Sequence, residues 1–316
     1  MNTPPALSKA NPTEVLRRLQ LTVNRRLDGM LMGDYQGLVP GHGSELGETR
    51  LYEPGDDVRR IDWNVTARMQ IPHIRETIAD RELELTLVVD LSPSLEFGTA
   101  NTTKRDLLVA AASAVGMLAG RSANRIGAVI ATGQGIVTLP PRSGRQALAA
   151  ALHKVIVTTA PDGSGPLDLT KALDAVARAT RRRGMVVVLS DFLTPGPITW
   201  DRPLRGMAHR HEVLAIEIVD PRELELPNVG LLDLVDPETG RGRTIDTAST
   251  HLRQRYADAA QAQRRQIANA IRRSGASHLV LRTDHDWLVE LARFVASRRR
   301  RGAGLSRGGP QAARLA

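Results

Sequence analysis

One carboxylate and two hydroxyls stand at alternate positions directly after a short apolar run. The run is residues 85–89, and the polar residues are Asp90, Ser92 and Ser94. A short run rich in Val and Leu predicts a buried parallel strand whose carboxyl end opens into a loop. Three hard oxygens that converge from such a loop suit a divalent cation such as Mg²⁺ better than zinc or copper. The alternative is an ordinary turn, in which Ser94 or Thr99 caps the next helix.

A second carboxylate, Asp191, follows another apolar run at residues 184–190. Open α/β sheets bind their ligands outside the carboxyl ends of the strands. If these two strands are neighbours, Asp90 and Asp191 face the same crevice. We therefore predict a metal site formed by Asp90, Ser92, Ser94 and Asp191, in which Asp191 acts directly or through water.

The composition is that of a folded protein without thiol chemistry. The chain has 316 residues, of which 41% are hydrophobic, and this suffices for one large domain and a smaller one. The lack of cysteine excludes disulfides, thiolate nucleophiles and iron–sulfur clusters, and it fits a reducing compartment. The chain starts without the apolar core of a secretory signal, and no run approaches the roughly 18 apolar residues of a membrane helix. We expect a cytoplasmic protein.

The net charge of +9 is concentrated at the carboxyl end of the chain. A Gly- and Arg-rich segment cannot bury apolar surface, so residues 297–316 are predicted to form a disordered tail. Such a tail can contact anionic lipid at the inner face of a membrane, nucleic acid without specific recognition, or an acidic partner, or it can simply keep the chain soluble. Its arginines, which no acidic residue accompanies, are Arg298, Arg299, Arg300, Arg301, Arg307 and Arg314.

Apolar periodicity divides the remaining chain into two domains. In the first, residues 1–80, an amphipathic helix over residues 13–32 is expected to pack on the protein itself, with a membrane surface as the alternative. Residues 33–80 are rich in Gly, Pro and charge, which predicts an irregular β segment. Residues 81–296 alternate strands with helices, which predicts an α/β domain with a doubly wound, mostly parallel sheet. Its strands are expected at 85–90, 125–131, 135–139, 184–190, 212–219 and 278–282, its β-hairpin at 229–246, and its helices at 104–120, 143–158, 168–182, 250–274 and 284–298.

A second group of charged residues lies upstream, after a tight Pro-Gly turn. Asp56, Asp57 and Asp62 alternate with arginines next to Trp63. Carboxylates that alternate this closely with arginines are usually paired with them, so we predict a network of ion pairs around one buried aromatic ring. The alternative makes the three aspartates general acids or metal ligands.

These two regions together resemble a known bacterial family. Over roughly residues 30–220 the chain is similar to the family called domain of unknown function fifty-eight. This resemblance implies a core like that of von Willebrand factor type A domains. It also implies work with a MoxR-type AAA+ ATPase in the chaperone-like maturation or assembly of client proteins. The residues that carry it are Tyr52-x-Pro54-Gly55-Asp56-Asp57-x-Arg59-x-Ile61-Asp62-Trp63-x-x-x-Ala67-Arg68, then Asp90-x-Ser92-x-Ser94, then Ser190-Asp191-Phe192.

The resemblance also implies a metal-ion-dependent adhesion site, but one ligand departs from the pattern. The family of type A domains places a threonine ligand shortly before an Ala-Leu pair. When Ala172 and Leu173 are aligned with that pair, Leu167 stands in place of the threonine. A leucine cannot coordinate a hard cation, although Asp168 or Thr170 could donate an oxygen. The site is therefore predicted to be degenerate and to bind Mg²⁺ weakly or not at all.

We interpret the chain as a non-enzymatic protein-interaction module whose crevice receives an acidic side chain from a partner. The alternative is a Mg²⁺-dependent hydrolase or nuclease that uses Asp90 and Asp191. Against this alternative, the sequence offers no evident general base near those loops and no second carboxylate cluster. It also lacks the phosphate-binding loop of nucleotide hydrolases and the serine elbow of esterases.

Overall fold

The computed structural model divides the chain into two compact units. The smaller unit is residues 39–82, and the larger combines residues 1–38 with 83–316. Each unit is a separate compact body. The residues that the structure describes are 14, 17–19, 21–23, 26, 49–53, 56–75, 84–119, 125–158, 165–237 and 239–306.

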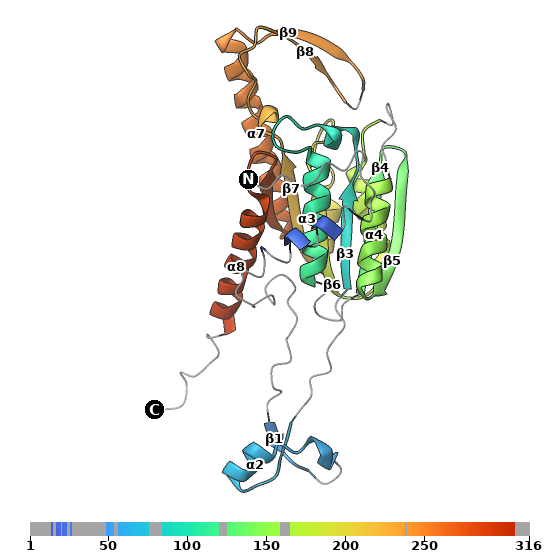
Figure 1. The fold of residues 1–316 in the computed structure, drawn as a ribbon, viewed down its shortest axis with the longest axis vertical. Helices are drawn as coiled ribbons and strands as arrows, with labels where there is room; N and C mark the ends of the chain where they lie inside the picture. Colours follow the sequence, from blue (N-terminus) through green and yellow to red (C-terminus); the bar gives the residue numbers. More distant parts are fainter. Residues whose placement is uncertain are drawn as a thin grey trace. The chain divides into compact units, whose positions relative to one another are not determined.

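The larger unit is built on a six-stranded sheet with the order β10-β7-β6-β3-β4-β5 (Figure 1). Neighbouring strands run parallel except β5, which pairs antiparallel with β4 at one edge. The prediction of a mostly parallel sheet is confirmed. The strands are β3 (Glu84–Asp90), β4 (Arg125–Thr132), β5 (Gly135–Ser143), β6 (Gly184–Ser190), β7 (Glu212–Val219) and β10 (Ser277–Arg282).

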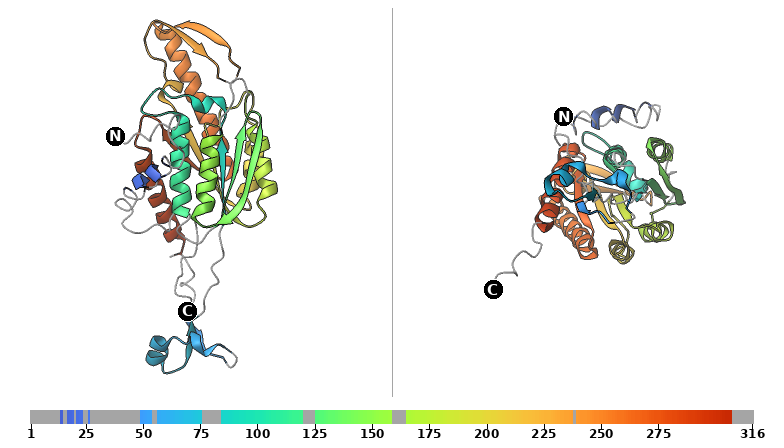
Figure 2. Two further views of the ribbon diagram at one scale, coloured as in Figure 1. Left: turned by 45° about the vertical axis from the view of Figure 1, so that its right-hand side comes forward. Right: turned by 90° about the horizontal axis from the view of Figure 1, so that it is seen from below.

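Helices cover both faces of this sheet, so it is doubly wound as predicted (Figures 1 and 2). The central strands are buried on both sides, which explains why their sequences are continuous apolar runs and do not alternate. One helix, α6, escaped prediction because it has only eight residues and includes a proline. One face carries α3 (Lys104–Ala119), α4 (Arg145–Val157) and α8 (Trp287–Ser306); the other carries α5 (Leu169–Ala179), α6 (Asp201–Ala208) and α7 (Thr250–Ser274).

The N-terminal segment packs on the larger unit at the positions that the structure describes. In the described part of the N-terminal segment, Leu19 and Val23 are buried, and the Arg26 guanidinium lies 2.7 Å from the Asp286 carboxylate. The predicted packing of this segment on the protein is therefore confirmed at these positions. Among the helices of the described ranges, none combines the length and the apolar character needed to cross a membrane.

Helix α8 corrects the predicted start of the tail. The helix continues to Ser306, whereas the sequence predicts its end at Arg298 and a disordered segment from residue 297. The Arg298 side chain forms an ion pair with Glu212 and lies over the ring of Phe294, 5.9 Å from its centroid. Arg298 is thus part of the folded unit, because a partly buried glutamate and an aromatic face compensate its charge. Residues 307–316 lie outside the described residues.

The smaller unit consists of short elements, β1 (Thr49–Leu51), the 3-10 helix η1 (Val58–Arg60), α2 (Trp63–Met69) and β2 (His73–Arg75). Asp57 accepts a hydrogen bond from a backbone amide at the start of η1, and Asp62 accepts two at the start of α2. The Trp63 side chain is 70% exposed. The prediction of a buried ring is wrong, because these short carboxylates cap the adjacent backbone and place Trp63 on the outer side of a short helix.

A glycine at the start of β6 provides a test of the sheet register. A Cβ atom at Gly184 would collide with the backbone carbonyl of Glu84 on β3, whereas one at Gly206 in α6 would meet open space. We expect Gly184→Ala to lower the free energy of unfolding by about 2 kcal/mol through overpacking. The control Gly206→Ala should raise it by up to about 1 kcal/mol through helix propensity. Urea unfolding of both variants makes the comparison, and equal stabilities would contradict the pairing of β3 with β6.

Candidate functional site at the carboxyl edge of the sheet

The two predicted acidic loops meet where the chain changes direction across the sheet. Strands β3 and β6 are parallel neighbours, with Val89 beside Leu189 in the register. From β3 the chain crosses to β4 on one side, and from β6 it crosses to β7 on the other. Such a reversal leaves a crevice outside the carboxyl ends of the two strands. Asp90 ends β3 and Asp191 directly follows β6, so both acids lie at this point.

Asp90 is buried and hydrogen-bonded on both carboxylate oxygens. Its Oδ1 accepts from the backbone amide of Ser92 at 2.8 Å, and its Oδ2 accepts from the Ser190 hydroxyl at 2.5 Å. Burial, and next the negative charge of Asp191, raise the pKa of Asp90 to about 7. The two motif hydroxyls, Ser92 Oγ and Ser94 Oγ, lie 3.0 Å apart.

Asp191 joins the serine pair to a lysine. Its Oδ2 accepts from Ser94 Oγ at 2.8 Å and from Lys104 Nζ at 2.8 Å, and its Oδ1 accepts from the Leu193 amide at 3.0 Å. Burial alone would raise the pKa of Asp191, but the Lys104 ammonium outweighs it and lowers that pKa. The structure thus brings Asp90, Ser92, Ser94 and Asp191 together, and it adds a cation that the sequence interpretation did not include.

Lys104 is the first residue of α3, and its side chain is 0% exposed. The ammonium forms ion pairs with Asp191 and with Glu223 from the loop after β7. Burial disfavours the charged lysine, but the two carboxylates outweigh that effect and raise its pKa. A lysine at the start of a helix opposes the helix dipole, and this was the one sequence signal for an unusual role.

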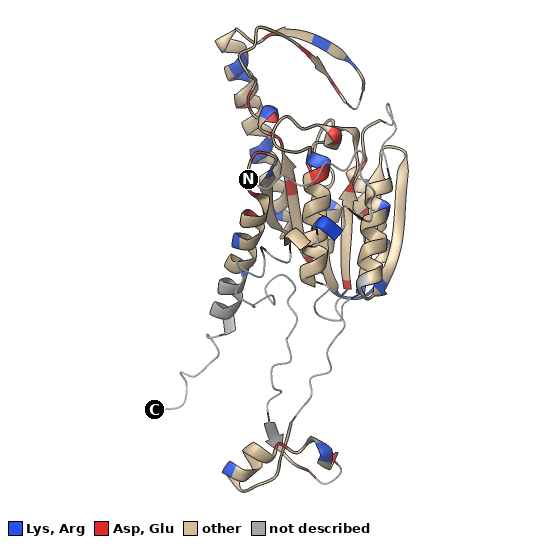
Figure 3. Ribbon diagram, in the orientation of Figure 1, with Lys and Arg blue, Asp and Glu red and all other residues tan. Residues whose placement is uncertain are grey.

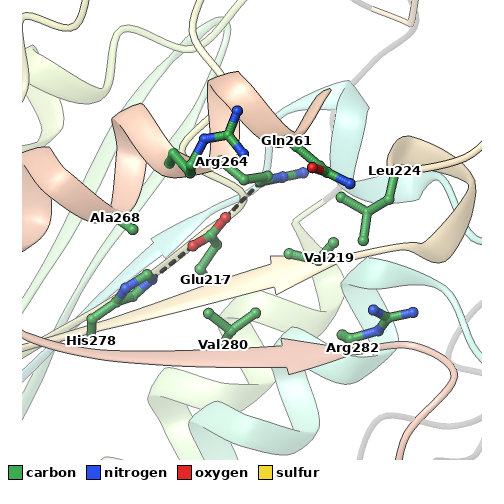
Figure 4. Close-up of a pocket in the computed structure, with 10 residues that line it drawn as sticks. Glu217, Val219, Leu224, Gln261, Arg264, Ala268, His278, Val280 and Arg282 are labelled. Atoms are coloured by element: carbon green, nitrogen blue, oxygen red, sulfur yellow. Dashed lines mark hydrogen bonds and ion pairs between the residues drawn. The ribbon is translucent and has the colours of Figure 1, made fainter. Parts of the chain in front are cut away.

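The charged cluster continues from Glu223 toward α7 and β10. Arg264 of α7 donates to Glu217 at 2.9 Å, to Glu223 at 2.8 Å and to the backbone carbonyl of Asp191 at 2.9 Å. The other oxygen of Glu217 lies 2.7 Å from His278 Nε2. Figure 4 shows the contacts of Glu217 with Arg264 and His278 at the wall of a cavity of about 390 Å³. Basic and acidic residues accordingly lie side by side above the carboxyl ends of the strands (Figure 3).

A third strand-end acid was missed by sequence reasoning although the same pattern marks it. Asp220 directly follows β7 and is fully buried. It accepts hydrogen bonds from the amide and hydroxyl of Thr99 at 2.9 and 2.5 Å, and from the Thr283 hydroxyl at 2.8 Å. Because Thr99 follows β3 and Thr283 follows β10, this carboxylate ties three strand-end loops together.

The residues near the predicted threonine position do not complete a metal site. Leu167 packs in the apolar core. Asp168 caps α5 by accepting from the Lys171 amide at 3.1 Å, and the Thr170 hydroxyl lies 2.8 Å from that of Thr199. Within the described ranges, no group of three or more His, Cys, Asp or Glu side chains is spaced to hold a metal ion.

The donor set therefore does not fit Mg²⁺ at Asp191. A hard cation needs carboxylate oxygens that are free to coordinate it. One oxygen of Asp191 already accepts from an ammonium and a hydroxyl, and the other accepts from a backbone amide. Asp90, the other carboxylate of the predicted set, likewise accepts a hydrogen bond on each oxygen. The predicted Mg²⁺ stays a prediction.

Comparison with known sequences identifies relatives over most of the chain. Residues 48–266 match the family model described as "Protein of unknown function DUF58". An uncharacterized protein of Mycobacterium tuberculosis is 55% identical over 287 residues, which cover 90% of this chain and 89% of that protein. An uncharacterized protein of Mycobacterium avium is 49% identical over 162 residues, which cover 51% of this chain and 94% of that protein.

Solved structures with a similar arrangement have low sequence identity. The conserved hypothetical protein BatB from Bacteroides thetaiotaomicron is 13% identical with a TM-score of 0.42, and the match covers 69% of this chain and 99% of that one. A von Willebrand factor type A protein from Catenulispora acidiphila is 12% identical with a TM-score of 0.39, covering 69% of this chain and 43% of that one. These likenesses concern the fold alone.

Proposed function

We propose that this chain, which belongs to the DUF58 family, is a non-enzymatic protein-interaction module. Its proposed binding face is the carboxyl edge of the sheet. The observation that carries the proposal is the fixed polar cluster at that edge. Hydrogen bonds and ion pairs hold the loops after β3, β6 and β7 in one arrangement. A surface that is already ordered loses little entropy when a partner binds.

The catalytic alternative has one feature in its favour, the pKa of Asp90 near 7. However, Asp90 is buried, and both its oxygens are occupied by Ser92 and Ser190. A general base must be within hydrogen-bond reach of its substrate. A panel of phosphate mono- and diesters with Mg²⁺ or Mn²⁺ separates the interaction module from the enzyme. Turnover that disappears in Asp90→Ala would establish the enzyme.

The partner we propose is a MoxR-type AAA+ ATPase together with its client proteins. Family membership supports this proposal. Near the polar cluster, Phe97 in the loop after β3 exposes 40% of its surface, and exposed aromatic side chains are frequent anchors in interfaces. We therefore place the main contact on this loop.

The test is binding of the full chain to the ATPase in each nucleotide state, measured on a sensor surface. Phe97→Ala should weaken binding at least about tenfold, the usual cost of losing an interface anchor. The matched control is Val137→Ala, because Val137 is also 40% exposed but lies on the edge strand β5. Absence of wild-type binding in every nucleotide state would refute the proposed partner. Binding lost in Trp63→Ala but kept in Phe97→Ala would move the contact to the smaller unit.

A further inference from the structure

We infer that the ammonium of Lys104 is the resident cation of the strand-end site and that the site works without a metal ion. The inference rests on the proposed function for the role of this edge as a binding face. It concerns the first residue of α3, which is 87 residues from Asp191 in sequence and contacts that carboxylate in the folded chain.

The position of the ammonium supports this inference first. Lys104 Nζ and Ser94 Oγ donate to the same oxygen, Asp191 Oδ2, each at 2.8 Å. The ammonium thus lies beside the second motif serine and the second motif acid. A metal ion bound by Ser94 and Asp191 would have to displace it or share its carboxylate oxygen, and like charges at such distances repel strongly in a buried site.

The charge balance of the cluster supports it next. Two carboxylates, Asp191 and Glu223, face two cations, Lys104 and Arg264. The Asp191 and Lys104 side chains are both fully buried. Because Asp191 and Glu223 each already contact a cation, their charge is largely neutralised and attracts a divalent ion only weakly.

The loss of oxygen donors agrees with this balance. Leu167, at the position where the family pattern places a threonine, packs in the apolar core. A divalent site requires negative charge and oxygen ligands. Lys104 neutralises the charge of Asp191 and Leu167 supplies no oxygen, so both requirements are missing. Because the ammonium is buried, it does not reach a partner, so a partner's acidic side chain finds no cation to bind here. Contact with the partner is therefore independent of chelators.

The experiment measures Mn²⁺ binding by electron paramagnetic resonance and thermal unfolding with and without Mn²⁺ or chelator, on the full chain. Wild type should bind no Mn²⁺ stoichiometrically, and chelator should leave its Tm unchanged. Lys104→Ala should lower Tm by about 10 °C, because it leaves two buried carboxylates short of a cation. The vacated space should admit one Mn²⁺ per chain, at least about tenfold tighter than in wild type, with partial recovery of Tm.

Two further variants complete the design. Lys104→Ala combined with Glu223→Gln removes one cation and one anion together, so it allows the Mn²⁺ measurement if the single variant fails to fold. The control Lys171→Met removes an exposed lysine and should change neither Tm nor Mn²⁺ binding.

Stoichiometric Mn²⁺ binding by wild type, with a lower Tm in chelator, would overturn the inference. So would an unchanged Tm in Lys104→Ala, or no gain of Mn²⁺ binding in either Lys104 variant. None of these measurements involves the ATPase, so failure of the proposed partnership is a separate result.

Discussion

Arg264→Met is expected to lower the free energy of unfolding by about 4 kcal/mol, because it breaks a buried ion pair from one side. The guanidinium holds Glu217 and Glu223 and also donates to the backbone of Asp191. Methionine keeps much of the side-chain volume but no charge. Among the described residues, Glu217 would then retain His278 alone, and Glu223 would depend on Lys104 for its remaining cation.

The control for this prediction is the next residue of the same helix. Arg265 is exposed, and its replacement by methionine should change stability by no more than about 0.5 kcal/mol. Guanidinium chloride would mask ion pairs, so unfolding is followed in urea. Equal losses in the two variants would mean that the buried network does not stabilise the fold. Adding Glu217→Gln to Arg264→Met should recover part of the loss, since it removes the acid left unpaired.

Asp90→Asn is expected to stabilise the protein at neutral pH, by on the order of 3 kcal/mol. Burial and the charge of Asp191 raise the pKa of Asp90 from 3.8 to about 7. Between these two values the folded state holds a proton that the unfolded chain has released. The stability that Asp90 contributes is therefore complete below pH 3.8 and is lost as the pH rises through 7. Asparagine does not titrate; its amide oxygen can accept from the backbone amide of Ser92, and its NH2 group can donate to Ser190 Oγ.

The measurement compares the urea unfolding of wild type and Asp90→Asn from pH 4 to pH 8. The difference should be small at pH 4 and should grow until about pH 8. Asp284→Asn is the opposite control, because the hydrogen bonds from Arg282 lower the pKa of Asp284. That variant should lose stability at neutral pH. A difference between wild type and Asp90→Asn that does not change with pH would contradict the raised pKa.

Local patterns predicted most of the larger unit. Strands β6 and β7 and helix α7 have the bounds that apolar runs and helical spacing indicate. The reason is that a buried strand or a helix face requires a specific arrangement of apolar residues within a short stretch of chain. The same reasoning placed Asp90 and Asp191 at strand ends, and the pairing of β3 with β6 brought the two acids together.

Local patterns failed where a charged or aromatic side chain has several possible partners. The ring of Trp63 was expected to be buried among ion pairs, but it is exposed, and Asp57 and Asp62 cap the backbone amides nearby. The arginines after residue 297 were expected to lie in a free tail, but Arg298 pairs with Glu212. In each case the sequence offers several possible partners, and its pattern does not show which of them the folded chain uses.

The sequence by itself determined the doubly wound α/β fold and the edge of the sheet at which its acidic loops lie. Only the tertiary structure decided how the charges at that edge are neutralised. Lys104 and Asp191 are 87 residues apart in the chain, and Arg264 and Glu223 are 41 apart. Strands form from apolar patterns that short segments contain, whereas the partner of a buried charge depends on how α3 and α7 pack over the finished sheet. The sequence therefore predicted carboxylates that bind a metal ion, whereas in the folded chain the ammonium of Lys104 lies against Asp191.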